Sequence, residues 1–125
     1  MKVVDASVIV DLLLGLIGID RLGDEHLVAP HLIDSEVLHS LRGRVLGGKL
    51  SQAQGDAAVR AFSSFFLERR PVANLHARIW ELRHNLSAYD ASYIALAEGL
   101  DATSLLTRDA ALAVSPGVRC RVEVV

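Results

Sequence analysis

KVVDASVIVDLLLG, residues 2–15, places a short strand, an acidic residue and a helix in immediate succession, and this succession indicates the class of fold. The apolar run at residues 2–4 ends at Asp5, which predicts a short buried strand. Residues 7–14 then carry apolar side chains at helical spacing, and Gly15 ends the predicted helix. A buried strand that leads directly into a helix is typical of a βαβ unit, in which the strands run parallel.

The same alternation continues through the rest of the chain. Further strands are predicted at residues 27–29, 71–73, 103–107 and 120–125, and further helices at residues 30–46, 51–65, 75–86, 87–98 and 109–116. Short apolar strands between amphipathic helices indicate a parallel sheet covered on both faces. A length of 125 residues suits one domain. We therefore expect one α/β domain over residues 1–125, with a mostly parallel central sheet of about 4–5 strands flanked by helices.

Composition excludes several classes of protein. Thirteen Lys and Arg against fifteen Asp and Glu give a net charge of −2, so bulk positive charge cannot hold this chain to nucleic acid. The single cysteine, Cys120, excludes an internal disulfide framework and a cysteine-rich zinc site. The apolar segment 6–19 contains Asp11 and is too short and too acidic to span a bilayer. We expect a cytoplasmic protein without a membrane segment.

Four carboxylates fall where the predicted elements meet at one edge of the sheet. Asp5 ends the first strand and Asp109 follows the fourth, and ligand sites of open α/β sheets lie outside the carboxyl ends of the strands. Glu36 falls within the apolar arc of its helix, and Asp90 aligns with the buried stripe of its own helix. Arg108 is the only adjacent cation. Such a cluster predicts a bound divalent cation, and oxygen-only ligands select Mg²⁺ or Mn²⁺ over zinc.

Each of these acids also has a structural explanation. Asp5 and Asp109 could cap the helices that follow them, and Ser87-x-x-Asp90 fits a capping box. Glu36 could pair with an arginine. The five histidines share no spacing of the kind that zinc enzymes use, and we interpret them as surface or partly buried residues.

Four segments together resemble the acidic motifs of PIN-domain ribonucleases. They are VVDASV at residues 3–8, SEVL with LR within residues 35–42, YDASYIALA at residues 89–97 and LLTRDAALA at residues 105–113. The segments occur in the family's order and extend over effectively the whole chain. At this length, the chain resembles the VapC-type toxins of bacterial and archaeal toxin–antitoxin pairs. The first motif departs mildly from the family, because Ala6 stands where many members carry threonine.

The resemblance implies roles for particular residues. The metal-binding, catalytic acids would be Asp5, Glu36, Asp90 and Asp109, with Mg²⁺ as cofactor and Mn²⁺ as a substitute. Ser7 and Thr107 match hydroxyl positions beside the first and fourth acids, where they would orient ligands or water. Alternatively, Ser7 caps the first helix and Thr107 is a strand-end hydroxyl.

The activity that the resemblance implies is metal-dependent endonucleolytic cleavage of structured RNA, such as tRNA or rRNA. A water activated by the metal would attack in line and leave a 5′-phosphate and a 3′-hydroxyl. We predict that Arg42 and Arg108 contact RNA phosphates, because arginine makes forked contacts with phosphate. The doublet at residues 69–70 is expected to be a solvated helix end.

The mean hydropathy of +0.34 is high for a small protein and predicts partner surfaces. It fits a homodimer and a cognate VapB-type antitoxin in a hydrophobic groove, which the resemblance also implies. Residues 11–19 hold more leucine and isoleucine than one buried helix face needs, so this segment is our first candidate for a protein contact. Trp80 is the second candidate, or else it fills the core.

Three other functions remain as alternatives. A PIN-like module that binds RNA or protein without cutting would share the fold. A receiver-type phosphoacceptor domain requires an adjacent acidic pair after the first strand and a lysine near the last. Here Ala6 follows Asp5, and the two lysines, Lys2 and Lys49, lie elsewhere. A flap-type DNA nuclease would use the same kind of metal site, but this short chain shows no additional DNA-binding elements.

Overall fold

Parallel pairing joins all five strands of the computed structural model, which describes residues 1–125. The strands are β1 (Lys2–Val4), β2 (Leu27–Pro30), β3 (Glu68–Arg70), β4 (Leu105–Thr107) and β5 (Val122–Val124). Their order in the sheet is β3-β2-β1-β4-β5, so β1 is central, and Val3 lies opposite Val28 on one side and Leu105 on the other. The predicted α/β class with a parallel sheet is confirmed.

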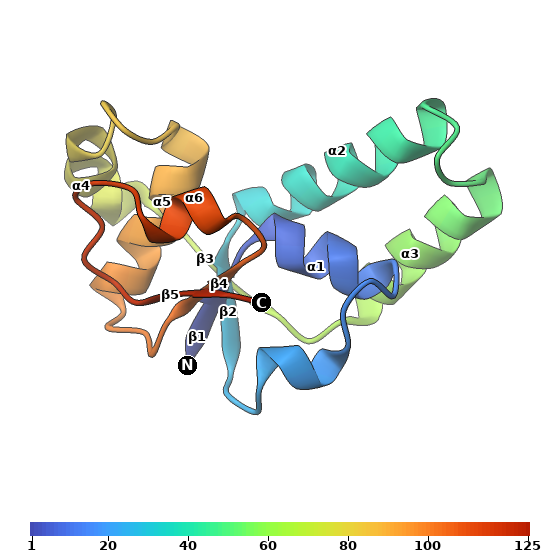
Figure 1. The fold of residues 1–125 in the computed structure, drawn as a ribbon, viewed down its shortest axis with the longest axis horizontal. Coiled ribbons are helices and arrows are strands. Elements are labelled where there is room, and N and C mark those ends of the chain that lie inside the picture. Colours follow the sequence, from blue (N-terminus) through green and yellow to red (C-terminus); the bar gives the residue numbers. More distant parts are fainter.

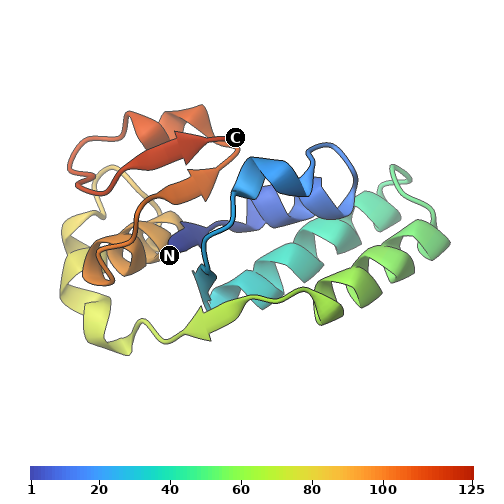
Figure 2. The same cartoon turned by 90° about the horizontal axis from the view of Figure 1, so that it is seen from below.

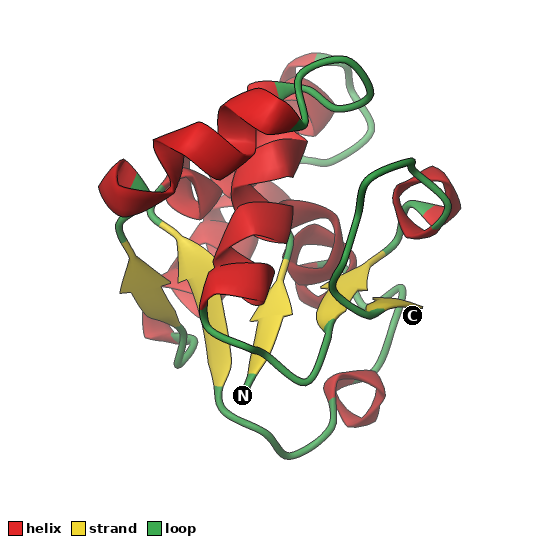
Figure 3. Cartoon of the chain, turned by 90° about the vertical axis from the view of Figure 1, so that its left-hand side faces the viewer, coloured by secondary structure: helices red, strands yellow, loops and turns green.

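Helices cover both faces of this sheet (Figure 1, Figure 2). They are α1 (Ala6–Leu13), α2 (Leu32–Leu46), α3 (Gln52–Ser64), α4 (His76–Glu81), α5 (Ala88–Gly99) and α6 (Ala110–Ala113), with 3₁₀ turns η1 (Ile19–Leu22) and η2 (Ala73–Leu75). Helices α1, α2 and α3 pack together on one side, and α4 and α5 pack together on the other. Figure 3 shows the strands side by side in the sheet.

The core forms where α5 crosses the central strands. Every residue of segment 91–97 is buried, and α5 contacts β1, β2 and β4. Three alanines in this segment let the helix approach the sheet closely. In the strands, Val3 and Leu105 are fully buried, as sheet residues covered on both faces are expected to be. Because α5 is tightly packed, its first turn is held in a fixed place at the carboxyl end of the sheet.

Helices α2 and α3 form a long arm that extends beyond the sheet (Figure 1). The arm turns at residues 47–51, where Gly48 has a φ of 76°, a conformation that favours glycine. Ser51 begins α3 with a capping box to Gln54. Gly55 allows the two helices to approach closely, because a Cβ there would lie 2.6 Å from a methyl group of Val45.

The prediction for residues 69–73 is wrong. The strand comprises residues 68–70 rather than 71–73, so Arg69 and Arg70 belong to edge strand β3 and not to a helix end. Arg69 forms a forked ion pair with Asp34 of α2, at 2.7 Å and 3.3 Å. Charged side chains suit an edge strand, and Pro71 ends it because proline lacks the backbone donor.

Two apolar regions behave differently from one another. Most of the leucines of segment 11–19 pack against the core, whereas Leu16 and Ile19 are 62% and 60% exposed. Trp80 does not fill the core, because its side chain is 67% exposed and lies against Arg83, 4.8 Å from the ring centroid. No helix has the length and apolar character needed to cross a membrane.

Candidate active site

The carboxyl ends of the two central strands bring Asp5 and Asp109 to one edge of the sheet. Asp5 follows β1 and caps α1, with its Oδ1 accepting from the Val8 N–H at 3.2 Å. Asp109 follows β4 and caps α6, with its Oδ1 accepting from the Ala111 N–H at 2.9 Å. The capping roles are therefore real. They also fix both carboxylates to rigid elements of the fold.

Two hydroxyl groups orient the Asp5 carboxylate. Ser7 Oγ donates to Oδ1 and Thr107 Oγ1 donates to Oδ2, each at 2.5 Å. Burial raises the pKa of Asp5; the hydrogen bonds from Ser7, Thr107 and Val8 oppose this rise, and the charge of Asp90 adds to it. Ser7 is not the cap of α1, since Asp5 occupies that position.

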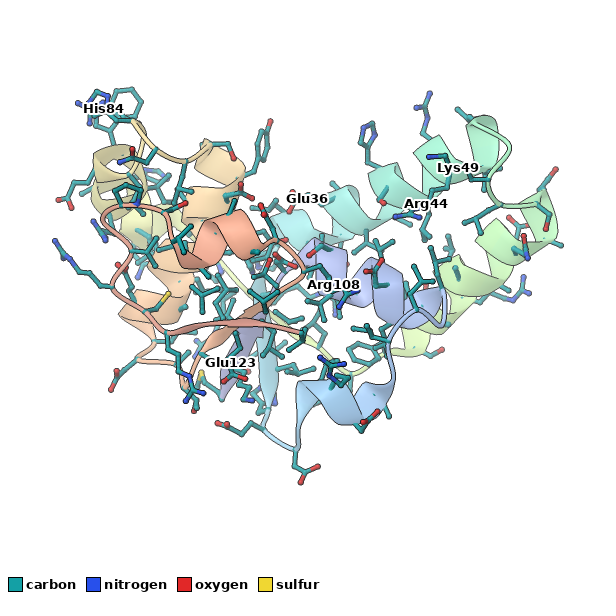
Figure 4. The ribbon with its side chains drawn as sticks, in the orientation of Figure 1. Glu36, Arg44, Lys49, His84, Arg108 and Glu123 are labelled. Carbon is teal, nitrogen blue, oxygen red and sulfur yellow. The ribbon has the colours of Figure 1, made fainter.

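Glu36 lies half-buried in the first turns of α2, near the centre of Figure 4. It does not pair with an arginine. Its partner is the hydroxyl of Tyr93, which donates to Oε1 at 2.6 Å. Burial raises the pKa of Glu36, and the charges of Asp90 and Asp5 raise it further, against the effect of the Tyr93 hydrogen bond.

Tyr93 is a residue of this site that the sequence analysis missed. Its ring is buried in the core, and burial together with the neighbouring Glu36 raises the pKa of its hydroxyl far above the usual range. The hydroxyl therefore stays protonated and donates. One signal was available in the sequence, because Tyr93 lies three residues after Asp90 and so on the same side of α5.

Asp90 lies in the first turn of α5, whose cap Ser87 accepts the Asp90 N–H at 3.1 Å. The residue is exposed, so the expectation that it opens the buried stripe of its helix is wrong; that stripe begins at Ala91. Partial burial of the carboxyl group raises the pKa of Asp90, and the charge of Asp109 raises it further.

The four acids influence one another electrostatically. Asp90 affects the pKa of Asp5 and of Glu36, and Asp109 affects that of Asp90, while no lysine or arginine contributes to any of these shifts. However, no three Asp, Glu, His or Cys side chains of the chain are close enough together to hold a metal ion as they stand. The arrangement is a connected cluster of like charges rather than a closed coordination shell.

The two predicted phosphate contacts are placed differently. Arg108 adjoins the cluster, but its Nε donates to Asp11 Oδ2 at 2.7 Å and its Nη1 to the Val125 carbonyl, while its backbone N–H donates to Ser7 Oγ. Arg42 lines the hollow between α2 and α3 and is not brought to the acids. Asp11 is a further acid near the site that sequence reasoning missed.

The set of oxygen donors suits a hard divalent cation. All four acidic side chains supply carboxylate oxygens, which Mg²⁺ and Mn²⁺ prefer, and no cysteine or histidine contributes to the pKa shifts of Asp5, Glu36 or Asp90. Burial raises the pKa of Asp5, Glu36 and Asp90, repulsion between the acids raises it further, and a cation between them would relieve that repulsion. Chemically, such a cluster can bind a divalent ion and accept a proton from water.

Comparison with known proteins identifies relatives of this arrangement. The model of the PIN domain family matches residues 2–115. Ribonuclease VapC1 of Mycobacterium tuberculosis is 41% identical, with 98% of this chain and 96% of that protein covered. Ribonuclease VapC9 of the same organism is 42% identical, with 100% of this chain and 98% of that protein covered.

Solved structures agree on the fold. The crystal structure of PAE2754 from Pyrobaculum aerophilum superposes with a TM-score of 0.70 and 26% identity, covering 98% of this chain and 83% of that one. Mycobacterium tuberculosis VapC20, a sarcin–ricin loop cleaving toxin, superposes with a TM-score of 0.69 and 19% identity, covering 95% of this chain and 97% of that one. The chain therefore belongs to the PIN-domain family and, within it, to the VapC ribonuclease toxins.

Proposed function

We propose that this protein is the endoribonuclease toxin of a type II toxin–antitoxin pair, which hydrolyses phosphodiester bonds of structured RNA, tRNA or rRNA, with Mg²⁺ or Mn²⁺ as cofactor. The observation that carries the proposal is the cluster of four acids at the carboxyl ends of β1 and β4. Three of the four carboxyl groups have a raised pKa, and none is paired with a lysine or arginine. The family membership supports the same activity.

The residues that would hold the cation are Asp5, Glu36, Asp90 and Asp109. A bound divalent ion supplies charge stabilisation for the phosphate and lowers the pKa of a bound water. The chain's own contribution is to hold the ligands in place. Ser7 and Thr107 fix the Asp5 carboxylate, and Tyr93 fixes that of Glu36. Helix capping fixes the backbone on which Asp5 and Asp109 stand.

An ionised carboxylate of the cluster would accept the proton of the attacking water. Asp5 and Asp90 are the candidates for this role. In-line attack by water leaves a 5′-phosphate and a 3′-hydroxyl, and the RNA 2′-hydroxyl takes no part as nucleophile.

RNA must approach an acidic site on a chain whose net charge is −2. Arg108 is the cation nearest to the acids in sequence, and an incoming phosphate would compete with Asp11 for its guanidinium group. Arg42 would contact RNA only if the substrate extends along the arm formed by α2 and α3. Binding is therefore expected to depend on a few placed arginines rather than on bulk charge.

We also propose a cytoplasmic homodimer that is neutralised by a VapB-type antitoxin. The exposed side chains of Leu16, Ile19 and Trp80 support partner surfaces, because large apolar groups in water favour association. Sedimentation of the isolated chain should give about twice 13.5 kDa. A monomer at micromolar concentration would contradict the dimer.

A module that binds RNA without cutting it is the second candidate. It is favoured by one observation, namely that no three acidic side chains stand close enough to hold a metal ion. In that case Asp5 and Asp109 would serve to cap α1 and α6, and RNA would bind elsewhere on the surface. Cleavage assays separate the two functions directly.

The test is cleavage of total tRNA and rRNA by purified, antitoxin-free protein with Mg²⁺, with Mn²⁺ and with EDTA. Asp90→Asn should abolish the specific cuts, as should EDTA. The matched control is Asp24→Asn, which changes an exposed aspartate that makes no ion pair and lies outside the cluster. Cuts that survive EDTA would contradict the metal mechanism, and absence of cutting in every condition would favour the binding module.

A further inference from the structure

A hollow of about 380 Å³ adjoins the acid cluster. It is lined by Ser35, Glu36 and His39 of α2 and by Tyr89 of α5. Its volume lies within the roughly 300–1,000 Å³ of ligand pockets. Glu36 belongs both to the hollow and to the cluster, and Tyr89 directly precedes Asp90. A group bound in this hollow would therefore lie beside the proposed catalytic acids.

The lining contains two aromatic rings that the fold does not use. Tyr89 is 65% exposed and its hydroxyl makes no hydrogen bond. His39 is also exposed and has no hydrogen-bonding partner in the chain. His39 is a neighbour of both Ser35 and Glu36 on the surface of α2, because it lies four residues after the first and three after the second. Both rings are thus free to contact a ligand.

The charge of the lining indicates which part of an RNA chain would fit. The hollow contains the Glu36 carboxylate and no lysine or arginine, so it disfavours a phosphate group. A nucleobase is flat and uncharged, and its amino groups can donate to a carboxylate or a hydroxyl. Proteins recognise single-stranded RNA by stacking its bases on aromatic rings and by hydrogen bonds to the base edges.

We propose that this hollow is a subsite for one unstacked base of the RNA substrate, in which the Tyr89 ring stacks on the base and Ser35 and His39 contact its edge. This inference rests on the proposed ribonuclease function and adds a requirement to it. A base can enter only where the RNA is unpaired, so cleavage is directed to loops, bulges and single strands. A paired nucleotide would have to leave its stack first.

The experiment measures binding separately from cleavage. A fluorescent, random-sequence RNA about 12 nucleotides long, within the range of single-strand site sizes, is titrated by anisotropy with Ca²⁺ in place of Mg²⁺. The variants are Tyr89→Leu and Tyr89→Phe. The matched control is Phe66→Leu, which removes another exposed aromatic side chain, in the segment before β3 and outside the hollow. A second RNA pool carries 4-thiouridine, which is cross-linked by light and located by mass spectrometry.

The expected result is a rise in Kd of about tenfold for Tyr89→Leu, with little change for Tyr89→Phe or for Phe66→Leu. The cross-link should lie on Tyr89 in the unmodified protein. In cleavage assays, Tyr89→Leu should raise KM for single-stranded RNA and leave kcat nearly unchanged, since the ring binds the base and does not touch the reacting phosphate. Equal melting temperatures will show that the variants fold.

Two results would overturn the subsite. One is an unchanged Kd for Tyr89→Leu, and the other is absence of any adduct on Tyr89. An unchanged Kd accompanied by altered sedimentation would assign the hollow to a protein contact instead. The proposed function fails separately. RNA that binds and cross-links at Tyr89 but is never cut would support the subsite and contradict the cleavage activity. RNA that is cut equally well by the unmodified protein and by Tyr89→Leu would support the cleavage activity and contradict the subsite.

Discussion

Glu36 and Glu98 have opposite electrostatic environments, although both are partly buried glutamates on helices that cover the sheet. Glu36 faces other carboxylates and has only the neutral Tyr93 hydroxyl as a partner, and its pKa is raised. Glu98 forms a forked ion pair with Arg78 at 2.7 Å and 3.1 Å. Burial of Glu98 opposes ionisation, but the Arg78 and Arg119 hydrogen bonds and charges outweigh it and lower its pKa.

The difference shows which region serves the fold and which serves the activity. Around Glu98, Arg78 also donates to the Gly117 carbonyl, so the ion pair ties α4, α5 and the segment before β5 together. Around Glu36, like charges are held near one another by the fold, which costs stability unless a cation neutralises them. Changes in the two regions should therefore have opposite consequences.

The largest effect is expected from Asp90→Asn. This change removes one carboxylate from the cluster but keeps the backbone N–H that donates to Ser87. RNA cleavage should fall by about 10²–10⁴-fold, as for loss of a group that acts in proton transfer or holds the metal. The free energy of unfolding should stay equal or rise, because one like charge is removed. A clear loss of stability in a urea titration would contradict the comparison.

Arg78→Met should have the reverse pattern. It leaves Glu98 partly buried without its cation and removes hydrogen bonds to two elements. The free energy of unfolding should fall by about 2–3 kcal/mol, as for hydrogen bonds to a charged group. Cleavage per folded molecule should be unchanged. Arg78→Lys serves as the control and should restore only part of the stability, since lysine lacks the planar fork.

Tyr93→Phe tests the hydrogen bond that holds Glu36. The ring stays in the core, so the free energy of unfolding should change by about 1 kcal/mol or less. Cleavage should fall about tenfold, because groups that orient a metal ligand typically contribute 10–100-fold. Wild-type cleavage in this variant would show that Glu36 is held sufficiently by the helix alone.

The smallest effect concerns pH. The pKa of Glu98 is lower in the folded protein than in the unfolded chain. Its ion pair therefore stabilises the fold fully above the unfolded pKa of 4.5. This stabilisation is lost as the pH falls through the lower pKa of the folded protein. The stability difference between the unmodified protein and Glu98→Gln should be present at neutral pH and shrink below pH 4.5. Urea titrations at a series of pH values measure it. A difference that stays constant with pH would mean that the charge of Glu98 does not contribute.

Local pattern was sufficient to predict most of the elements. The first strand and helix, β2, α2, α3 and α5 lie within a few residues of the predicted ranges, because each depends on apolar spacing, caps and glycines nearby in sequence. Strand β3 was misplaced because its residues are charged and its pairing depends on an edge position that no local pattern encodes. The predicted helix 75–86 is also shorter in the structure, where α4 ends at Glu81 and the buried Leu82 follows it.

The local order of strand, acid and helix is enough to predict carboxylates at the carboxyl ends of central strands, because the three follow one another directly in the chain. Which groups meet those carboxylates depends on tertiary packing. Tyr93 reaches Glu36 across 57 residues, Thr107 reaches Asp5 across 102, and Arg108 is engaged by Asp11 across 97. Hydrogen bonds form over about 3 Å, so partners distant in sequence depend on how whole helices pack against the sheet, which the periodicity of any single segment does not specify.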